Sequence, residues 1–202
     1  AGRQSRERKA EDARGRCGGM ERIFAPWRIE WVRREDHADA VDGCPFCVLP
    51  ERDADRENRI LARSRHAFVI CNNAPYNPGH VMVIPDAHEG DYARLSPPAV
   101  ADHARLKQAT FDAVRAALEP NGLNAGLNHG GAAAGGSIDD HVHTHVVPRF
   151  EGDTNFMPVV GDTTVIVEAI DETYDLLRTA FAGLDCAREP TDEDAAVEVR
   201  FE

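Results

Sequence analysis

The chain has 202 residues, 42% hydrophobic and 29% charged, which suffices for one domain with a substantial core. Its formal net charge of −12 argues against a general nucleic-acid binder, because such a protein needs a basic face for phosphates. No run of 18 apolar residues and no secretory signal is present, so neither a membrane span nor export is expected. The five unevenly spaced cysteines then predict reduced thiols in a cytoplasmic protein.

Composition divides the chain into three parts. Residues 1–19 are polar and basic without an apolar period, which predicts a disordered N-terminal extension. Residues 20–184 are predicted to form one folded domain. Its first stretch, residues 24–32, is rich in aromatic side chains that should be buried in the domain or on a partner subunit. Residues 185–202 are acidic and are predicted to be a loose tail.

The hydrophobic periodicity predicts five strands and two helices. The strands are expected at residues 59–62, 67–72, 80–85, 123–127 and 142–147. Helices are expected at residues 98–118 and 164–184, where apolar side chains recur at helical spacing. Strands, one long helix and then more strands predict an α+β fold with an antiparallel sheet.

A cluster of histidines stands out in the last predicted strand. Side chains alternate along a strand, so His141, His143 and His145 of the segment HVHTHVV should share one face. Three imidazoles in register disfavour a merely solvated face, because such clusters usually mark metal or catalytic sites. They could hold a catalytic zinc ion, or one imidazole could act as a nucleophile. The preceding Gly-rich segment HGGAAAGGS resembles a phosphate-binding loop, which favours the nucleophile. A zinc hydrolase is less favoured, because no carboxylate that could act as its general base stands at a characteristic spacing from the histidines.

A second set of residues could bind metal. Cys44 and Cys47 form a CxxC motif, which alone could be redox-active, structural or accidental. Two Cys and two His form a standard tetrahedral zinc site, and His88 and His141 are the candidate partners. A structural zinc is therefore expected. The other histidines receive no role and are predicted to be surface residues, with His103 on the exposed side of its helix; they are His37, His66, His103 and His129.

These motifs resemble those of the histidine-triad family, written His-φ-His-φ-His-φ-φ with φ apolar. HVHTHVV fits this pattern with Thr144 as a polar exception, and NPGHVMVIP at 77–85 resembles the family's other signature. Within the family the chain is similar to the diadenosine tetraphosphate phosphorylase branch, on APWR at 25–28, GLNHGG at 126–131 and HVVPRFEGDTNFMPV at 145–159. The resemblance covers residues 24–160 and implies a histidine-triad catalytic domain and a homodimer that shares a continuous sheet.

The resemblance also implies residue roles. His143 would attack the α-phosphorus of a nucleotide and carry it as a nucleotidyl-imidazole, with His145 stabilising charge and His80 supporting the triad. In the galactose-1-phosphate uridylyltransferase branch the first triad histidine binds metal, which would be His141 here. The expected substrate contacts are Asn73 at the ribose, Asn128 near the phosphates, Gly136, Ser137 and Arg149 at phosphate, and Phe150, which replaces the Trp often found in this branch.

The function expected from this resemblance is that of a phosphorylase. Such an enzyme converts diadenosine tetraphosphate and inorganic phosphate into ADP and ATP. One alternative is a hydrolase of dinucleoside polyphosphates or nucleoside phosphoramidates, which would use nearly the same site. Another is a nucleotide-binding protein with little catalysis, although the intact triad argues against it, because a binder needs no nucleophile.

Overall fold

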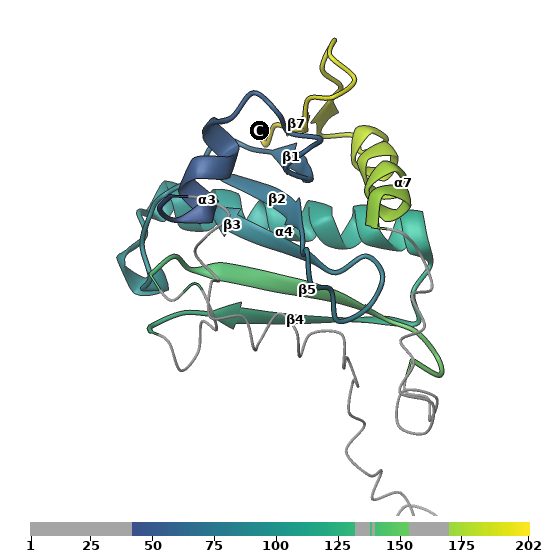
Figure 1. The fold of residues 1–202 in the computed structure, drawn as a ribbon, viewed down its shortest axis with the longest axis horizontal. Helices are drawn as coiled ribbons and strands as arrows, with labels where there is room; N and C mark the ends of the chain where they lie inside the picture. Colours follow the sequence, from purple (N-terminus) through teal and green to yellow (C-terminus); the bar gives the residue numbers. More distant parts are fainter. Residues whose placement is uncertain (1–41, 132–137, 139, 154–169) are drawn as a thin grey trace, which may run out of the picture.

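The computed structural model describes residues 42–131, 138, 140–153 and 170–202 (Figure 1). The described residues form a seven-stranded sheet in the order β4-β5-β3-β2-β1-β7-β6. Helix α4 packs on β2 and β3, and α7 packs on α4 and β1. All neighbouring strands are antiparallel except β1 and β7, which are parallel. The predicted α+β fold is confirmed, with one parallel strand pair in addition.

The element bounds confirm the five predicted strands to within two residues at each end. The strands are β1 (Ile60–Arg63), β2 (Ala67–Cys71), β3 (Val81–Pro85), β4 (Gly122–Asn128), β5 (His143–Arg149), β6 (Ala187–Arg188) and β7 (Val197–Val199). The helices are α3 (Pro45–Val48), α4 (Pro97–Leu118) and α7 (Ile170–Ala182), with 3-10 turns η1 (Leu49–Glu51) and η2 (Tyr92–Arg94). The predicted extension 1–19, the aromatic stretch 24–32 and the start of the second predicted helix lie outside the described residues. No helix in the described ranges is long and apolar enough to cross a membrane.

Helix α4 begins with ordinary capping chemistry. The Ser96 hydroxyl accepts a hydrogen bond from the Ala99 N–H at 3.4 Å, and two prolines occupy the first turn. The buried stripe of the helix includes His103, which is only 1% exposed. The prediction that His103 faces solvent is therefore wrong. It stands at helical spacing from buried Ala99 and Leu106, and its hydrogen bonds compensate for the burial of the ring.

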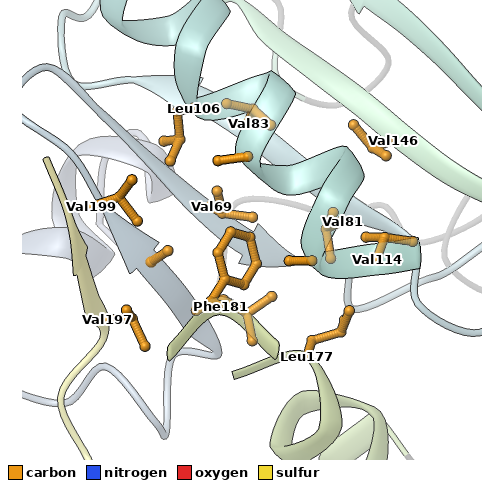
Figure 2. Packing of buried hydrophobic residues seen from close by; sticks show 14 of the residues in the cluster. Val69, Val81, Val83, Leu106, Val114, Val146, Leu177, Phe181, Val197 and Val199 are labelled. Carbon is orange, nitrogen blue, oxygen red and sulfur yellow. The ribbon is translucent and has the colours of Figure 1, made fainter. Parts of the chain in front are cut away.

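The main core lies between the sheet and the two long helices (Figure 2). Val69 and Val83 contribute from the sheet, Leu106 from α4 and Phe181 from α7, and all four are fully buried. This arrangement covers one face of the central strands with α4, which crosses behind the sheet in Figure 1. The histidines of β5 lie on the other face.

The C-terminal residues complete the sheet, so the prediction of a loose tail from residue 185 is wrong. Strand β7 pairs with β1 in parallel, with Ala62 opposite Val197, and β6 pairs with β7. Val197 and Val199 are buried in the core. The alternating segment at 197–199 is only three residues long and follows an acidic stretch, and its partner strand lies more than 130 residues earlier. Local sequence therefore gives little sign of it.

Gly79 is required by both its conformation and its neighbours. Its φ is +78°, and a Cβ there would overlap Leu118 Cδ1 and lie 3.2 Å from Pro148 Cγ. We expect Gly79→Ala to destabilise the fold by about 2 kcal/mol or more, from left-handed strain together with overpacking. Urea denaturation measures the loss. Gly126→Ala in β4 is the matched control, because a Cβ there meets nothing within 4 Å; equal losses in the two variants would contradict this account.

Candidate active site and metal centre

The histidines of β5 lie on the sheet face opposite α4, beneath the short helix α3. His143 is buried, and its ring centroid lies 5.3 Å from that of Phe46 in α3. On the other face of β5, Thr144 contacts α4 through His103. The period of two therefore places His143 and His145 together, as predicted, while His141 lies just before the strand. The two rings of His143 and His145 meet edge to face at 5.0 Å.

The surroundings of His143 fix its tautomer. Its Nδ1 lies 2.9 Å from the backbone oxygen of His141, and a carbonyl oxygen can only accept. Nδ1 therefore carries the hydrogen, and Nε2 presents a lone pair. Burial lowers the pKa of His143, with the hydrogen bond to His141 opposing this effect. The ring is consequently neutral near pH 7, as a nucleophile must be.

A chain of hydrogen bonds also fixes His80 and His145. The backbone N–H of Tyr76 donates to His80 Nδ1 at 3.0 Å. The hydrogen of His80 is then on Nε2, which donates to His145 Nδ1 at 2.9 Å. His145 in turn carries its hydrogen on Nε2. The Asn128 amide nitrogen lies 3.3 Å from Nε2 of both His143 and His145. It can donate a hydrogen bond to the lone pair of His143 Nε2, whereas His145 Nε2 carries a hydrogen and cannot accept one.

Four side chains beside this site are arranged as metal ligands. One ligand atom each from Cys44, Cys47, His88 and His141 lies within 4.8 Å of the others. The Nδ1–Sγ separations are 3.4 and 3.6 Å from His141 to Cys44 and Cys47, and 3.3 Å from His88 to Cys47. Zinc bond lengths to sulfur and nitrogen in a tetrahedron predict an edge of about 3.5 Å. The four residues therefore fit a tetrahedral metal ion.

The tautomers of the two histidines support the same interpretation. His141 Nε2 lies 2.7 Å from the Pro85 carbonyl oxygen, and His88 Nε2 lies 3.4 Å from an Asp140 carboxylate oxygen. Both acceptors hold the hydrogen on Nε2, which turns the Nδ1 lone pairs toward the cysteines. Burial and the adjacent Cys44 raise the pKa of the Cys47 thiol to about 11. A thiolate is therefore stable here only beside a cation.

The Cys2His2 cluster and His143 share two supports. The ring of His141 belongs to the ligand set, while its backbone oxygen holds His143 Nδ1. Phe46 lies between Cys44 and Cys47 in sequence and contacts the rings of both His141 and His143, at 5.6 and 5.3 Å. Phe46 has no predicted role, although its place inside the CxxC motif is a usable signal.

The structure brings some predicted substrate contacts to the site and leaves others away from it. Asn128 lies within hydrogen-bonding distance of His143 and His145, and His145 in turn accepts from His80. Asn73 is exposed, and its side-chain oxygen accepts a hydrogen bond from Arg59 at 2.8 Å. Gly136 and Ser137 lie outside the described residues.

Arg149 and Phe150 lie at the far end of β5. Six residues of strand separate Arg149 from His143, which corresponds to roughly 20 Å. The guanidinium of Arg149 forms a bidentate salt bridge with the Asp153 carboxylate, at 2.8 and 3.1 Å, and also donates to the Asn124 side-chain oxygen. These bonds lower the pKa of Asp153 to about 2. Arg149 thus anchors the turn after β5.

Two residues of the turn before β3 were missed. The Asn72 amide nitrogen lies 3.5 Å from His80 Nε2, and its oxygen accepts from the Ala74 N–H. The ring of Tyr76 stacks on His80 with centroids 5.0 Å apart. Both residues belong to the segment NNAPYNPG, whose closeness to His80 in sequence is a signal that its side chains border the site.

Fold and site together define an α+β protein whose sheet presents a neutral, oriented histidine beside a Cys2His2 ligand set. Comparison with known proteins agrees. The HIT domain model matches residues 54–152. A protein of Mycobacterium tuberculosis named AP-4-A phosphorylase is 33% identical over 173 residues, 83% of this chain and 88% of that protein. The chain belongs to the HIT, or histidine-triad, family.

Solved structures show the same fold. A Zn-bound histidine-triad family protein from Mycobacterium smegmatis superimposes with a TM-score of 0.56 at 30% identity, over 71% of this chain and 96% of that one. An ADP-glucose phosphorylase from Arabidopsis thaliana superimposes with a TM-score of 0.55 over 71% of this chain and 45% of that one. Its identity is 15%, so it supports the fold alone.

Proposed function

We propose that this protein is a nucleotidyltransferase that cleaves dinucleoside polyphosphates, with inorganic phosphate as the acceptor, through a nucleotidyl-His143 intermediate. The observation that carries the proposal is the hydrogen bond from His143 Nδ1 to the His141 carbonyl, which aims the Nε2 lone pair into the site. The name of the Mycobacterium tuberculosis relative supports diadenosine tetraphosphate as the substrate.

In the first step His143 Nε2 attacks the α-phosphorus. The new P–N bond forms as the P–O bond to the remaining polyphosphate breaks, so diadenosine tetraphosphate gives ATP and an AMP group on His143. The imidazole becomes cationic, and the His141 carbonyl stabilises its Nδ1–H. His145 Nε2–H is placed to donate to a phosphoryl or leaving oxygen, and His80 holds the other side of that ring.

In the second step an oxygen of inorganic phosphate attacks the same phosphorus and the P–N bond breaks. ADP leaves, and His143 regains its lone pair. Phosphate must outcompete water, which requires a bound anion whose effective molarity is on the order of 10⁵ M or more. Because Asp153 pairs with Arg149 far from His143, we assign this anion to Ser137 and the N–H groups around Gly136.

The identity of the acceptor is tested with labelled phosphate. We expect the label to appear in ADP, with ATP formed in equal amount, and turnover to fall sharply when phosphate is removed. Product separation after incubation with diadenosine tetraphosphate measures both effects. If AMP and ATP form at the same rate with and without phosphate, the protein is a hydrolase, and the acceptor part of the proposal fails.

We further propose that the metal is a structural zinc ion held by Cys44, Cys47, His88 and His141. The donor set and its edge lengths suit zinc, and the Zn-bound relative supports this choice. When bound, zinc supplies positive charge for two thiolates and cross-links α3 to the segments that carry His88 and His141. It holds the scaffold of His143 and takes no part in the transfer.

The protein is also proposed to be a homodimer. Strand β4 is an edge strand of the sheet, its side chains are mostly exposed, and Leu127 is 41% exposed. An edge of this kind is normally covered, and a second copy that adds its own β4 would continue the sheet. The solution mass of the protein tests this assembly.

A further inference from the structure

Thr144 places a hydroxyl on the buried face of β5. It lies between His143 and His145 in sequence, and the next residue on its face, Val146, is part of the apolar core. A hydroxyl buried without a hydrogen bond destabilises a protein, because it has lost its bonds to water. The polar exception in the triad motif therefore needs a specific partner on the side of α4.

That partner is His103. Its Nε2 lies 3.2 Å from the Thr144 hydroxyl and 3.4 Å from the backbone oxygen of Val83. Val83 and Thr144 are directly opposite each other in the β3–β5 pair. The His103 imidazole on α4 thus contacts β3 and β5 at the same paired position. On β5 this position lies between His143 and His145.

The environment of His103 defines its state. Nε2–H is the tautomer that serves the two oxygen acceptors, whereas Nδ1 is buried and has no partner in the part of the chain that the structure describes. Burial, helped by nearby Lys107, lowers the pKa of His103 to about 4. The ring is therefore neutral near pH 7. Tyr92 packs against it edge to face at 5.6 Å and limits its movement.

We propose that His103 is a positioning residue for the nucleotidyl transfer. By holding Thr144 and Val83 from behind the sheet, its imidazole fixes where β5 carries His143 and His145. This inference rests on the proposed role of His143 as the nucleophile. Reacting atoms must approach within about 3–3.5 Å, and a misplacement of about 1 Å can slow a reaction roughly a hundredfold. The contacts of His103 with β3 and β5 are therefore expected to affect the rate of nucleotidyl transfer.

The decisive variant replaces both partners with apolar residues of similar size. His103→Leu with Thr144→Val leaves neither side chain unsatisfied, so the melting temperature should stay close to that of the wild type. The rate of nucleotidyl-His143 formation in a single turnover should nevertheless fall roughly ten- to a hundredfold, with little change in nucleotide affinity. His103→Gln should recover most of the rate lost in His103→Leu, because its amide can place an N–H near the position of Nε2.

Thr110→Val is the matched control. Thr110 is equally buried on α4, but among the described residues its hydroxyl bonds only to the Leu106 carbonyl within the helix. We expect this variant to lose stability and to keep the wild-type rate. The proposal is overturned if the double variant forms the intermediate at the wild-type rate. It is also overturned if Thr110→Val slows the reaction as much as His103→Leu does.

A second readout separates this inference from the proposed function. Nitrogen NMR of the His143 ring reports whether Nδ1 or Nε2 carries the hydrogen, even in a protein that transfers no nucleotide. We expect the same His143 ring signals in the wild type and in His103→Gln, and displaced signals in the double variant, because the position of His143 Nε2 relative to Asn128 of β4 changes when β5 shifts. An unchanged His143 spectrum in the double variant would overturn the positioning role. Absence of turnover in the wild type would instead overturn the proposed function.

Discussion

Replacing His143 with alanine is expected to lower turnover of diadenosine tetraphosphate by about four orders of magnitude or more. The variant lacks the atom that forms the P–N bond, and loss of a covalent nucleophile has effects of this size in other enzymes. Nucleotide affinity should change little, because His143 acts mainly in the chemistry. Steady-state kinetics and equilibrium binding of a nucleotide measure the two effects separately.

Two further variants sharpen this test. His143→Gly leaves space for free imidazole, which should restore part of the activity in a concentration-dependent way. His129→Ala is the matched control, since His129 is exposed and pairs with Asp91 outside the triad. Full activity in His143→Ala would remove His143 from the mechanism. A loss as large in His129→Ala would show that the effect is not specific to the nucleophile.

Removal of the metal is expected to have the second largest effect. Metal analysis should find about one zinc per chain, and Cys44→Ser should lose it, because the remaining three ligands no longer close the tetrahedron. The linkage between binding and folding gives a loss of about 4 kcal/mol if zinc is present at a thousand times its dissociation constant. Metal content and thermal unfolding, with and without a chelator, measure the change.

The shared supports of the two sites predict a further consequence of chelation. Turnover should fall together with stability, because His141 holds the nucleophile through its carbonyl and binds metal through its ring. Cys186→Ser is the control, since Cys186 is partly buried and lies outside the ligand set. A native protein that contains no metal and is as stable as one supplied with zinc would contradict the metal assignment.

The sequence by itself determined five of the seven strands, the long helix and the residue types that make up the candidate site. A period of two placed His143 and His145 on one face, and the structure confirms it. The residue types alone predicted that Cys44, Cys47, His88 and His141 would come together from three separate segments, and the structure places them within 4.8 Å of one another. These inferences succeeded because they depend on local periodicity and on the chemistry of each side chain, both of which are written along the chain.

The tertiary structure decided which groups those side chains meet. The tautomers of His141 and His143 depend on two backbone carbonyls, and no residue type encodes the position of a carbonyl oxygen. The partner of the Arg149 guanidinium, the Asp153 carboxylate, is likewise a property of the folded turn after β5.

The two predictions that the structure overturns have the same physical origin. His103 was predicted to face solvent because it is polar, yet Thr144, 41 residues away, compensates for its burial. The C-terminal strand β7 is short and follows an acidic stretch of sequence. It is stabilised by pairing with β1 and by the apolar core into which Val197 and Val199 pack. Contacts between distant segments determine such cases, because the free energy of burying a group depends on its partner as much as on the group itself.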